Sequence, residues 1–461
     1  MANIKFGTDG WRAIVGKDFN EENVETVTKA IAKYIIENFK EKKILIGYDP
    51  RNKADDFANQ SANILKDLGF KVLLSEKIVP TPVLAYGAKN LDTCAIMFTA
   101  SHNPPEYLGM KFIPNYAGPA TKEITDALTK NLNTNVEKTS DGKIVLYDFL
   151  PEYQKHIEKL IDFEKIKTLN SKILYNGLYS ASIGYFDKIL QDNEIEIETM
   201  NMFRDVNFAG GMPDPKPEYL KDLIEKIKQS KETTIGVSND GDGDRFGIIN
   251  ENGEFVTANE IISILLLYLK ENKKMEGPLV KTVAGSLLLN KIAEKTNTEV
   301  IETAVGFKHV GEAMRKFNPI IGGEESGGLS IQNHIPEKDG IIADLLVLEA
   351  MAVKGKSLVE LQKEVETLAN AKYLNERIDL KLESQEQVKT ALEKMNSFEK
   401  IAEFKVIKKD AKDGIKIYLD DEQSWILVRA SGTEPLLRIY FETDKAEKMT
   451  LLQKEVLNLI K

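Results

Sequence analysis

Three aspartates, Asp240, Asp242 and Asp244, are separated by single glycines, and Arg245 follows them directly. The apolar run before them, residues 234–237, is typical of a buried strand. Glycine permits a tight backbone path, so three side chains can converge on one point just after this strand. Converging carboxylates repel one another unless a cation lies between them, and oxygen ligands suit a hard cation such as Mg²⁺. Because Mg²⁺ seldom takes an all-protein cage, a phosphate oxygen can complete such a site.

Two other interpretations of the aspartates compete with a magnesium site. An aspartate- and glycine-rich segment after a strand is often a solvated turn. The second alternative is a calcium loop, whose first, third, fifth and twelfth positions would be Asp240, Asp242, Asp244 and Glu251. That loop needs glycine where Arg245 stands, and strands rather than helices are predicted on its flanks. The spacing therefore argues against an EF-hand and leaves a turn or a magnesium site.

A serine lies in a loop after another predicted strand. The strand Cys94–Phe98 leads into the loop 99–105, which holds Ser101 and His102 and ends in two prolines. A serine in this position can act as a nucleophile, although turn formers before prolines are also common in ordinary loops. No GxSxG surrounds Ser101, which argues against a serine-hydrolase triad. Lys111 follows on the next predicted strand and can return towards Ser101.

Three further segments combine glycine with residues that bind phosphate or sugar hydroxyls. Near the N-terminus, a glycine-punctuated loop ends in Arg12. The segment 323–328 offers the Glu324 carboxylate and the Ser326 hydroxyl, which suit adjacent sugar hydroxyls. The segment 429–435 offers a guanidinium, two hydroxyls and backbone N–H groups, which suit a phosphate. Taken alone, the Arg12 loop is more simply an ordinary turn, and a glycine-rich turn between strands would also account for the segment 323–328.

The elements around these loops alternate between strand and helix. The predicted strands are 44–49, 71–74, 94–98, 172–175, 234–237 and 279–283. The predicted helices are 21–39, with Asn20 as its N-cap, and 54–68, 152–167, 218–229 and 258–270. This alternation predicts α/β sandwiches with mainly parallel strands. From about Ala371 the alternation stops, and short strands and two helices are predicted, including a strand at 425–428 and a helix at 445–460.

Composition and charge place the chain among globular proteins. The 461 residues are 29% charged and 42% hydrophobic, and this length predicts three or four domains. The net charge of −10 argues against nucleic-acid binding. The longest apolar run, residues 261–269, is too short to cross a bilayer, and the N-terminus lacks the apolar stretch of a signal peptide. With Cys94 as the only cysteine, we expect a cytoplasmic protein that binds neither nucleic acid nor membrane.

Together these loops resemble the α-D-phosphohexomutase family of phosphoglucomutases and phosphomannomutases. The segment 99–104 is similar to its phosphoserine loop, 240–245 to its metal loop, 323–328 to its sugar-binding loop and 429–435 to its phosphate-binding loop. The four segments occur in the family's order. The resemblance implies an α/β protein of four domains. Three are mixed α/β sandwiches at 1–150, 151–254 and 255–370, and the fourth is a TATA-box-binding-protein-like α+β domain at 371–461.

The resemblance also implies a phosphoenzyme mechanism. Ser101 would pass a phosphate to a hexose monophosphate and recover the other phosphate of the bisphosphate. A phosphate oxygen on Ser101 would bind Mg²⁺ together with Asp240, Asp242 and Asp244. Lys111 matches a family lysine assigned acid–base work, which requires burial or neighbouring cations to lower its pKa. The other implied catalytic residues are Arg12 near the phosphoryl group, His102 as electrostatic support for the phosphoserine, and Arg245 bracing the phosphate or the metal loop.

The residues that the resemblance implies for substrate binding are Thr303, Gly306, Lys308, Glu324, Ser326, Lys338, Arg429, Ser431, Gly432 and Thr433. The loop 323–328 has the Glu-Glu-Ser form of glucose-specific members and lacks the histidine of mannose and glucosamine members. The resemblance thus implies interconversion of glucose 1-phosphate and glucose 6-phosphate by a monomer or homodimer, with glucose 1,6-bisphosphate as intermediate and activator. Alternatives are a phosphomannomutase, a phosphoglucosamine mutase and a noncatalytic sugar-phosphate-binding protein.

Overall fold

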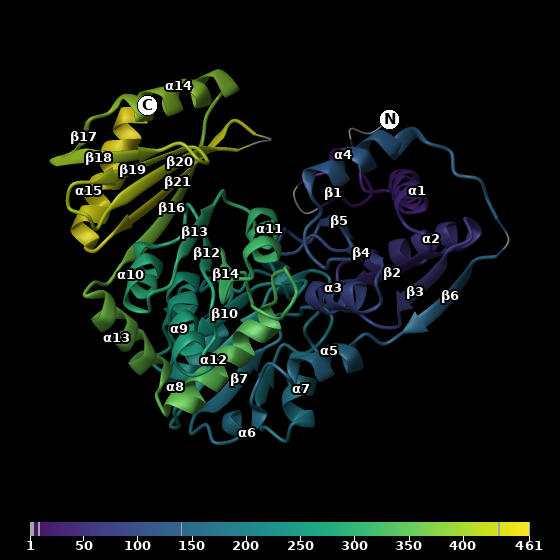
Figure 1. The fold of residues 1–461 in the computed structure, drawn as a ribbon, viewed down its shortest axis with the longest axis horizontal. Helices are drawn as coiled ribbons and strands as arrows, with labels where there is room; N and C mark the ends of the chain where they lie inside the picture. Colours follow the sequence, from purple (N-terminus) through teal and green to yellow (C-terminus); the bar gives the residue numbers. More distant parts are fainter. Residues whose placement is uncertain (1–3, 8–9, 140, 432–433, 461) are drawn as a thin grey trace.

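The computed structural model describes residues 4–7, 10–139, 141–431 and 434–460. Its described strands form four sheets that follow one another along the chain (Figure 1). The first sheet and the C-terminal sheet lie at opposite ends of the molecule, and the second and third lie between them. The protein therefore has a four-domain α/β architecture, as the sequence predicts. No helix in the described ranges is long and apolar enough to cross a membrane.

The first sheet has the strand order β1-β5-β4-β2-β3-β6. Its four strands β2, β3, β4 and β6 pair in parallel, and β5 and β1 add antiparallel strands at one edge. The strands are β1 (Trp11–Ile14), β2 (Lys43–Tyr48), β3 (Lys71–Ser75), β4 (Cys94–Phe98), β5 (Tyr107–Ile113) and β6 (Lys143–Tyr147). The helices are α1 (Glu21–Asn38), α2 (Ala54–Asp67), α3 (Thr81–Asn90), α4 (Lys122–Lys130) and the 3₁₀ turn η1 (Asn131–Asn133). Asn20 caps α1 by accepting a hydrogen bond from the Asn23 N–H at 3.0 Å, as predicted.

The second sheet has the order β11-β10-β9-β7-β8. Its strands are β7 (Lys172–Asn176), β8 (Glu198–Met200), β9 (Thr234–Asn239), β10 (Phe246–Ile249) and β11 (Phe255–Val256). Its helices are α5 (Leu150–Ile157), α6 (Phe163–Ile166), α7 (Phe186–Asp192), η2 (Phe208–Gly210) and α8 (Lys221–Gln229). The single helix predicted at 152–167 is wrong, because α5 ends at Ile157 and the Asp162 side chain starts α6 by accepting from the Lys165 N–H at 3.1 Å.

The third sheet has the order β13-β12-β14-β15, with β15 antiparallel to β14. Its strands are β12 (Leu279–Thr282), β13 (Val300–Thr303), β14 (Ile321–Gly323) and β15 (Leu329–Ile331). Its helices are α9 (Ala258–Glu271), α10 (Leu287–Lys295), α11 (Phe307–Phe317), α12 (Gly340–Lys354) and α13 (Leu358–Ala369). One buried apolar cluster runs from the first domain through the second into α9 and α12. The first three domains therefore share a core that fixes them to one another.

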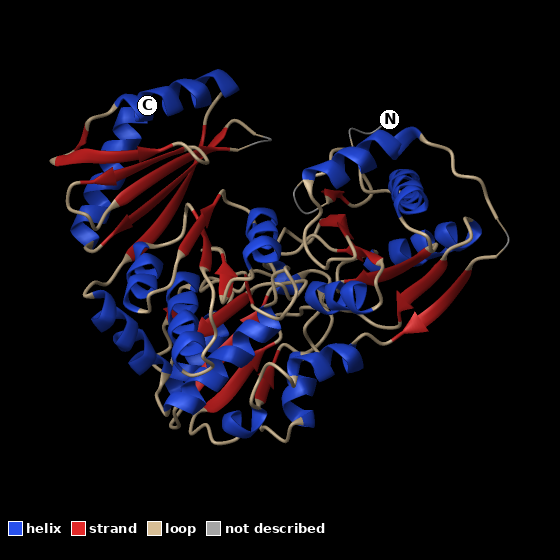
Figure 2. Ribbon diagram, in the orientation of Figure 1, coloured by secondary structure: helices blue, strands red, loops and turns tan. Residues whose placement is uncertain are grey.

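The C-terminal sheet is antiparallel throughout, with the order β16-β21-β20-β19-β18-β17. Its strands are β16 (Leu374–Lys381), β17 (Lys400–Ile401), β18 (Phe404–Asp410), β19 (Ile415–Leu419), β20 (Trp425–Ala430) and β21 (Leu436–Thr443). The helices α14 (Gln385–Ser397) and α15 (Ala446–Ile460) pack together on one face of the sheet and form a separate core with it (Figure 2). The opposite face of the C-terminal sheet is not covered by these two helices.

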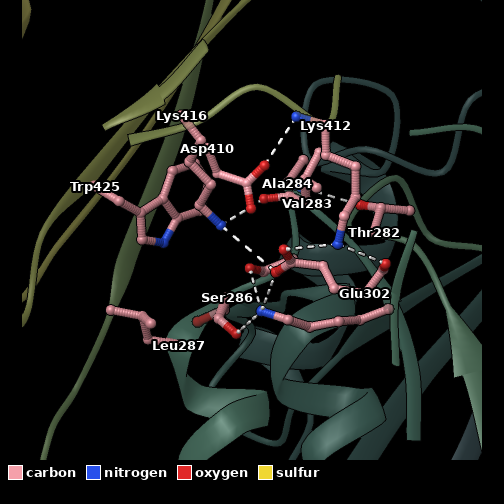
Figure 3. Close-up of polar contacts among 12 residues, drawn as sticks. Thr282, Val283, Ala284, Ser286, Leu287, Glu302, Asp410, Lys412, Lys416 and Trp425 are labelled. Carbon is pink, nitrogen blue, oxygen red and sulfur yellow. Dashed lines mark hydrogen bonds and ion pairs between the residues drawn. The ribbon is translucent and has the colours of Figure 1, made fainter. Parts of the chain in front are cut away.

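The C-terminal sheet meets the third sheet at a buried cluster of charges (Figure 3). Lys416 Nζ, on β19, donates to the Val283 carbonyl just beyond β12 at 2.6 Å. The carboxylate of Glu302, on β13, lies 3.9 Å from Lys416 Nζ and 3.6 Å from Lys281 Nζ. Lys412 Nζ approaches the same carboxylate at 3.8 Å. This joint holds the C-terminal domain against the third, and three ammonium groups share the Glu302 carboxylate.

The joint predicts a pH dependence of stability. Burial, together with the charge of Lys281, lowers the pKa of Lys416 to about 7. In an unfolded chain a lysine pKa is about 10.4, so between these values the unfolded state binds more protons than the folded state. The free energy of unfolding then rises with pH by up to about 1.4 kcal/mol per pH unit. We expect the melting temperature to rise from pH 7 to pH 9, as measured by differential scanning calorimetry.

Two variants test whether Lys416 causes this rise. Lys416→Met keeps an unbranched side chain without a titrating group, so most of the rise should disappear. Lys405→Met changes an exposed lysine of the same sheet and should keep the rise of the wild type. A wild-type melting temperature that is flat or falls over this range would contradict the expectation.

Candidate active site

The three predicted metal ligands lie in the loop between β9 and β10, and glycines let that loop pass close to its neighbours. A Cβ on Gly241 would lie 2.6 Å from the Ser101 carbonyl oxygen, so only glycine permits this approach. Gly243 has a φ of +74°, and a Cβ there would lie 2.4 Å from Ser182 Oγ. The loop is also held by the Thr81 N–H, which donates to the Asp242 carbonyl at 2.8 Å. The sequence thus folds the aspartate loop directly against the Ser101 loop.

The three carboxylates converge as predicted. One oxygen each of Asp240, Asp242 and Asp244 lies within 4.8 Å of the others, and all three side chains are buried. Burial and the charges of its two partners raise the pKa of Asp240 well above its usual range. Burial and Asp242 likewise raise the pKa of Asp244. For Asp242 burial acts in the same direction, but Lys111, Lys338 and the Thr81 hydroxyl outweigh it and lower the pKa.

This arrangement fits a hard divalent cation. Asp242 Oδ1 and Asp244 Oδ1 are buried and have no hydrogen-bond partner among the described residues. Buried carboxylate oxygens without a donor are costly, and a cation bound by all three aspartates would satisfy them and relieve the mutual repulsion. The donor set consists of oxygen alone, which favours Mg²⁺ over softer metals. An acidic metal-binding triad is therefore present where the sequence predicts it.

Ser101 lies beside this triad. Its Oγ donates to Asp240 Oδ2 at 2.8 Å and lies 3.3 Å from His102 Nδ1. Its φ of +52° is unusual for a residue with a Cβ, and its side chain is 2% exposed. Burial, followed by the charges of Arg245 and Arg12, lowers the pKa of His102 well below its usual value. The lowered pKa favours the neutral imidazole, and His102 contacts Ser101 through Nδ1.

The Ser101 loop is held in place by Arg51, a residue that the sequence analysis missed. Arg51 NH2 donates to the carbonyls of Ser101 and Asn103, both at 2.6 Å. Its NH1 donates to the Pro104 carbonyl at 2.8 Å, and its Nε lies 3.2 Å from Asp49 Oδ2. A fully buried arginine that contacts several carbonyls of one loop can stabilise the loop's strained path. The only signal in the sequence was a charged residue close behind the strand β2.

Arg12 reaches the same loop from β1. Its NH1 donates to Asn103 Oδ1 at 2.8 Å. Arg12 lies on β1, which pairs with β5, and Gly109 on β5 is its register partner. A Cβ on Gly109 would meet Arg12 Cγ at 2.7 Å, so the glycine leaves room for the arginine stem. The sequence-predicted neighbourhood of Arg12 and the serine loop is thus present.

Two lysines from different domains approach the aspartates. Lys338 Nζ lies 2.8 Å from Asp244 Oδ2, and Lys111 Nζ lies 3.9 Å from the same oxygen. Lys111 is on β5, next to the strand that leads into the Ser101 loop, as predicted. Lys111 Nζ also lies 2.9 Å from Glu337 Oε2, a carboxylate that the sequence analysis did not single out. Lys111, Lys338 and Glu337 are all buried.

The predicted sugar-binding loop joins β14 to β15 and adjoins the metal loop. The Phe246 N–H donates to the Gly327 carbonyl at 3.0 Å, which places residues 323–328 beside Arg245. Glu324 Oε1 accepts from the Gly306 N–H at 2.8 Å, so the segment 303–308 lies against the loop. Ser326 is exposed, whereas Thr303 and Lys308 are half-buried. The structure therefore brings together the two segments that the sequence assigns to the sugar.

The predicted phosphate-binding segment connects β20 to β21 on the C-terminal sheet. Arg429 lies near the end of β20, and the Ser431 N–H donates to the Leu436 carbonyl at 2.8 Å. Gly432 and Thr433, also predicted to bind the phosphate, lie outside the described residues. Arg438, on β21, is the register partner of Arg429, which places two arginines side by side. The sequence analysis missed Arg438, because the pairing of β20 with β21 decides its position.

Comparison with known proteins agrees with this geometry. Models for the α/β/α domains I, II and III of phosphoglucomutase/phosphomannomutase match residues 3–139, 151–253 and 257–368. The model for the C-terminal domain of the same family matches residues 387–459. These matches cover most of the chain and occur in the order of the four sheets.

Curated relatives and a solved structure match over nearly their whole length. The phosphoglucomutase/phosphomannomutase of Thermococcus kodakarensis is 31% identical over 96% of this chain and 95% of its own. The phosphoglucosamine mutase of Methanocaldococcus jannaschii is 30% identical over 99% of this chain and 98% of its own. A crystal structure from Thermus thermophilus, provisionally named a phosphomannomutase, is 29% identical with a TM-score of 0.88 and covers 100% of this chain and 99% of its own.

A serine beside a buried acidic triad, with cations from three domains around it, defines a phosphoryl-transfer enzyme. The chain belongs to the phosphoglucomutase/phosphomannomutase family of α-D-phosphohexomutases. It is therefore an intramolecular phosphotransferase of the isomerase class, which excludes a noncatalytic sugar-phosphate-binding protein. The names of its relatives differ in the sugar, so the family alone does not decide the substrate.

Proposed function

We propose that the protein interconverts glucose 1-phosphate and glucose 6-phosphate through a phosphate carried on Ser101. The observation that carries the proposal is the 2.8 Å contact of Ser101 Oγ with Asp240 inside a cluster of three buried carboxylates. Asp240, Asp242 and Asp244 would hold Mg²⁺ together with an oxygen of the phosphoserine. When bound, the metal neutralises charge on the phosphoryl group during transfer.

Several residues of the chain have separate roles in phosphoryl transfer. A sugar hydroxyl oxygen attacks the phosphorus, and the bond from phosphorus to Ser101 Oγ breaks with its electron pair on Oγ. The hydroxyl proton passes to the neutral amine of Lys111, which gives it to Oγ. The return step reverses these changes with the other phosphate of glucose 1,6-bisphosphate, which leaves Ser101 phosphorylated again. Lys338 and Arg12 supply positive charge near the phosphoryl group, and Arg245 braces the metal loop. Arg51 holds the backbone of the serine loop through its carbonyls.

The remaining site residues would bind the sugar and its nonreacting phosphate. Glu324 and Ser326 would pair with two neighbouring hydroxyls, most simply those at C3 and C4 of glucose. Thr303, Gly306 and Lys308 lie in the segment against that loop. The nonreacting phosphate would be held by the C-terminal segment, through Arg429, Ser431, Gly432 and Thr433. Closure of that domain towards the Ser101 loop would let it hold the nonreacting phosphate while transfer occurs at Ser101.

The sugar preference gives the test of this proposal. Mannose differs from glucose only at C2, so Glu324 and Ser326 alone cannot reject it, and one unmade hydrogen bond at C2 costs about 1–3 kcal/mol. We expect kcat/KM for glucose 1-phosphate to exceed that for mannose 1-phosphate by roughly ten- to a hundredfold. Glucosamine 1-phosphate should be poorer still, because its ammonium would face the cations that hold phosphate.

The measurement is kcat/KM for the three sugar 1-phosphates with a trace of the matching 1,6-bisphosphate. Product is followed through the appropriate coupled dehydrogenase or by phosphorus NMR. A higher value for mannose 1-phosphate would make the protein a phosphomannomutase. A higher value for glucosamine 1-phosphate would make it a phosphoglucosamine mutase, the alternative that the M. jannaschii relative favours.

A further inference from the structure

The turn between β18 and β19 reaches from the C-terminal sheet to the third domain. Within it, Asp413 Oδ2 accepts a hydrogen bond from the Val305 backbone N–H at 2.8 Å. The same oxygen lies 2.8 Å from NH2 of Arg429. A single carboxylate oxygen therefore joins the segment that precedes α11 to the arginine of the phosphate-binding segment. Neither contact belongs to the metal site or the serine loop.

The residue after Val305 makes the matching contact on the sugar side. The Gly306 N–H donates to Glu324 Oε1 at 2.8 Å. The N–H groups of the consecutive residues Val305 and Gly306 thus donate to two carboxylates. Glu324 belongs to the predicted sugar-binding loop, and Asp413 contacts Arg429 of the predicted phosphate-binding segment. The positions of Glu324 and Arg429 are set relative to each other through this short piece of backbone and Asp413.

The turn that contains Asp413 is held by contacts with two strands, one in each domain. Gly414 has a φ of +82°, and a Cβ there would lie 2.3 Å from the Val428 carbonyl oxygen and 3.1 Å from Arg429 Cα. Only glycine lets the turn pack this closely on β20. On the other side, Lys412 Nζ donates to the Glu302 carbonyl at 2.9 Å, in the cluster of Figure 3. Asp413 therefore lies in a turn fixed to β20 and to β13.

The contact leaves donors of Arg429 for an anion. A guanidinium has five N–H donors, and Asp413 pairs with one of its terminal nitrogens. Arg429 Nε is buried and has no hydrogen-bond partner among the described residues. The side chains of Arg429 and Asp413 are 14% and 23% exposed, so solvent competes little with their pairing.

We propose that Asp413 is a positioning residue that orients Arg429 relative to the sugar-binding loop. One hexose phosphate can then contact Glu324 and Arg429 at the same time. The inference rests on the proposed function only in that Arg429 binds the nonreacting phosphate. A guanidinium oriented before binding loses less side-chain entropy when the phosphate arrives. The charge of Asp413 has the opposite effect, because it repels the phosphate. We expect the gain from orienting Arg429 to exceed this repulsion, since the charge of Asp413 is already paired with Arg429.

The experiment is a double-mutant cycle of Asp413→Asn with Arg429→Ala in the full-length enzyme. The amide of Asp413→Asn keeps an oxygen for the Val305 N–H but removes the charge that orients Arg429. We expect KM to rise about tenfold in this single variant, the loss of one charge-assisted hydrogen bond, with kcat within about threefold. In the Arg429→Ala background the same change should alter KM by less than about twofold, because Asp413 then has no arginine to orient.

A matched control and a reserve variant complete the design. Asp420→Asn changes an exposed aspartate in the turn that follows β19 and should leave KM and kcat unchanged. If Asp413→Asn does not fold, Asp413→Glu replaces it in the cycle, because it keeps the carboxylate and displaces it by one methylene. A KM that stays constant or falls in the single variant would overturn the proposal, as would an equal rise in both backgrounds.

The cycle is measured with whichever of the three sugar 1-phosphates gives the highest kcat/KM. If glucose 1-phosphate is not the preferred substrate, the double-mutant cycle can still be measured, because it needs only a hexose phosphate that the enzyme converts. Failure of the Asp413 proposal would show in the variants alone, with wild-type turnover of glucose 1-phosphate unaffected.

Discussion

Replacing Ser101 by alanine should lower kcat by on the order of 10⁶-fold, the size of effect found when a nucleophilic serine is removed. Alanine cannot carry a phosphate, and no other hydroxyl among the described contacts donates to Asp240. The stability of the variant should change little, because the lost hydroxyl group lies beside carboxylates that a cation can satisfy. Activity is measured with glucose 1-phosphate and a trace of bisphosphate, and intact-mass spectrometry shows whether one phosphate is present.

The control for this prediction is Ser397→Ala, at an exposed serine in α14. It should retain full activity and the phosphate of the wild type. Peptide mapping of active wild-type protein should locate the phosphate at Ser101. Wild-type activity in Ser101→Ala protein, or a phosphate mapped to another residue in active enzyme, would contradict the phosphoenzyme mechanism.

The secondary structure was largely predictable because its signals are local. The strand Cys94–Phe98 and the Asn20 cap of α1 follow from a buried apolar run and from an amide at a helix start. The segment 152–167 was mispredicted because the helix break depends on Asp162, whose side chain caps α6. Helical periodicity continues across such a break, so it does not reveal where one helix ends and another begins.

The convergence of the aspartate loop was also predictable, because it depends on carboxylates at short spacing after a buried strand. Asp240, Asp242 and Asp244 converge as their spacing predicts. The supporting residues were not predictable, because their function depends on tertiary contacts. Arg51 is recognisable only once the loop it contacts is in place, and Arg438 only once β20 and β21 pair.

Buried lysines were the least predictable feature. Lysine is almost never fully buried, so a lysine within a strand is ordinarily assigned to the surface. Lys281 and Lys416 are both buried at the joint between the third and C-terminal domains. Each is compensated by carbonyls and carboxylates from elements far apart in sequence, such as Val283 for Lys416. Local sequence contains none of these partners.

Replacing Asp242 by asparagine should lower kcat by roughly 10²- to 10³-fold, the usual cost of losing one electrostatic contact to a transferring group. The substitution is close to isosteric. Asp242 Oδ2 accepts from the Thr81 hydroxyl at 2.6 Å, and an amide oxygen can keep that contact. What is lost is one negative charge and the buried Oδ1, which has no hydrogen-bond partner among the described residues. The substitution should therefore weaken metal binding and leave the fold largely unchanged.

Two measurements separate these effects. Activity is titrated with Mg²⁺ after treatment with EDTA, and the concentration for half-maximal rate should be higher in Asp242→Asn. The melting temperature is followed in the same titration, because a ligand that binds only the folded state stabilises it by mass action. Mg²⁺ should raise the melting temperature of the wild type more than that of the variant.

Asp126→Asn is the matched control, because Asp126 is exposed on α4 and pairs with Lys122. It should respond to Mg²⁺ as the wild type does. Activity that survives both EDTA and the Asp242→Asn substitution would mean that the three carboxylates form only a buried turn. The unpartnered oxygens of Asp242 and Asp244 argue against that outcome, since a turn without a cation would leave them buried and unsatisfied.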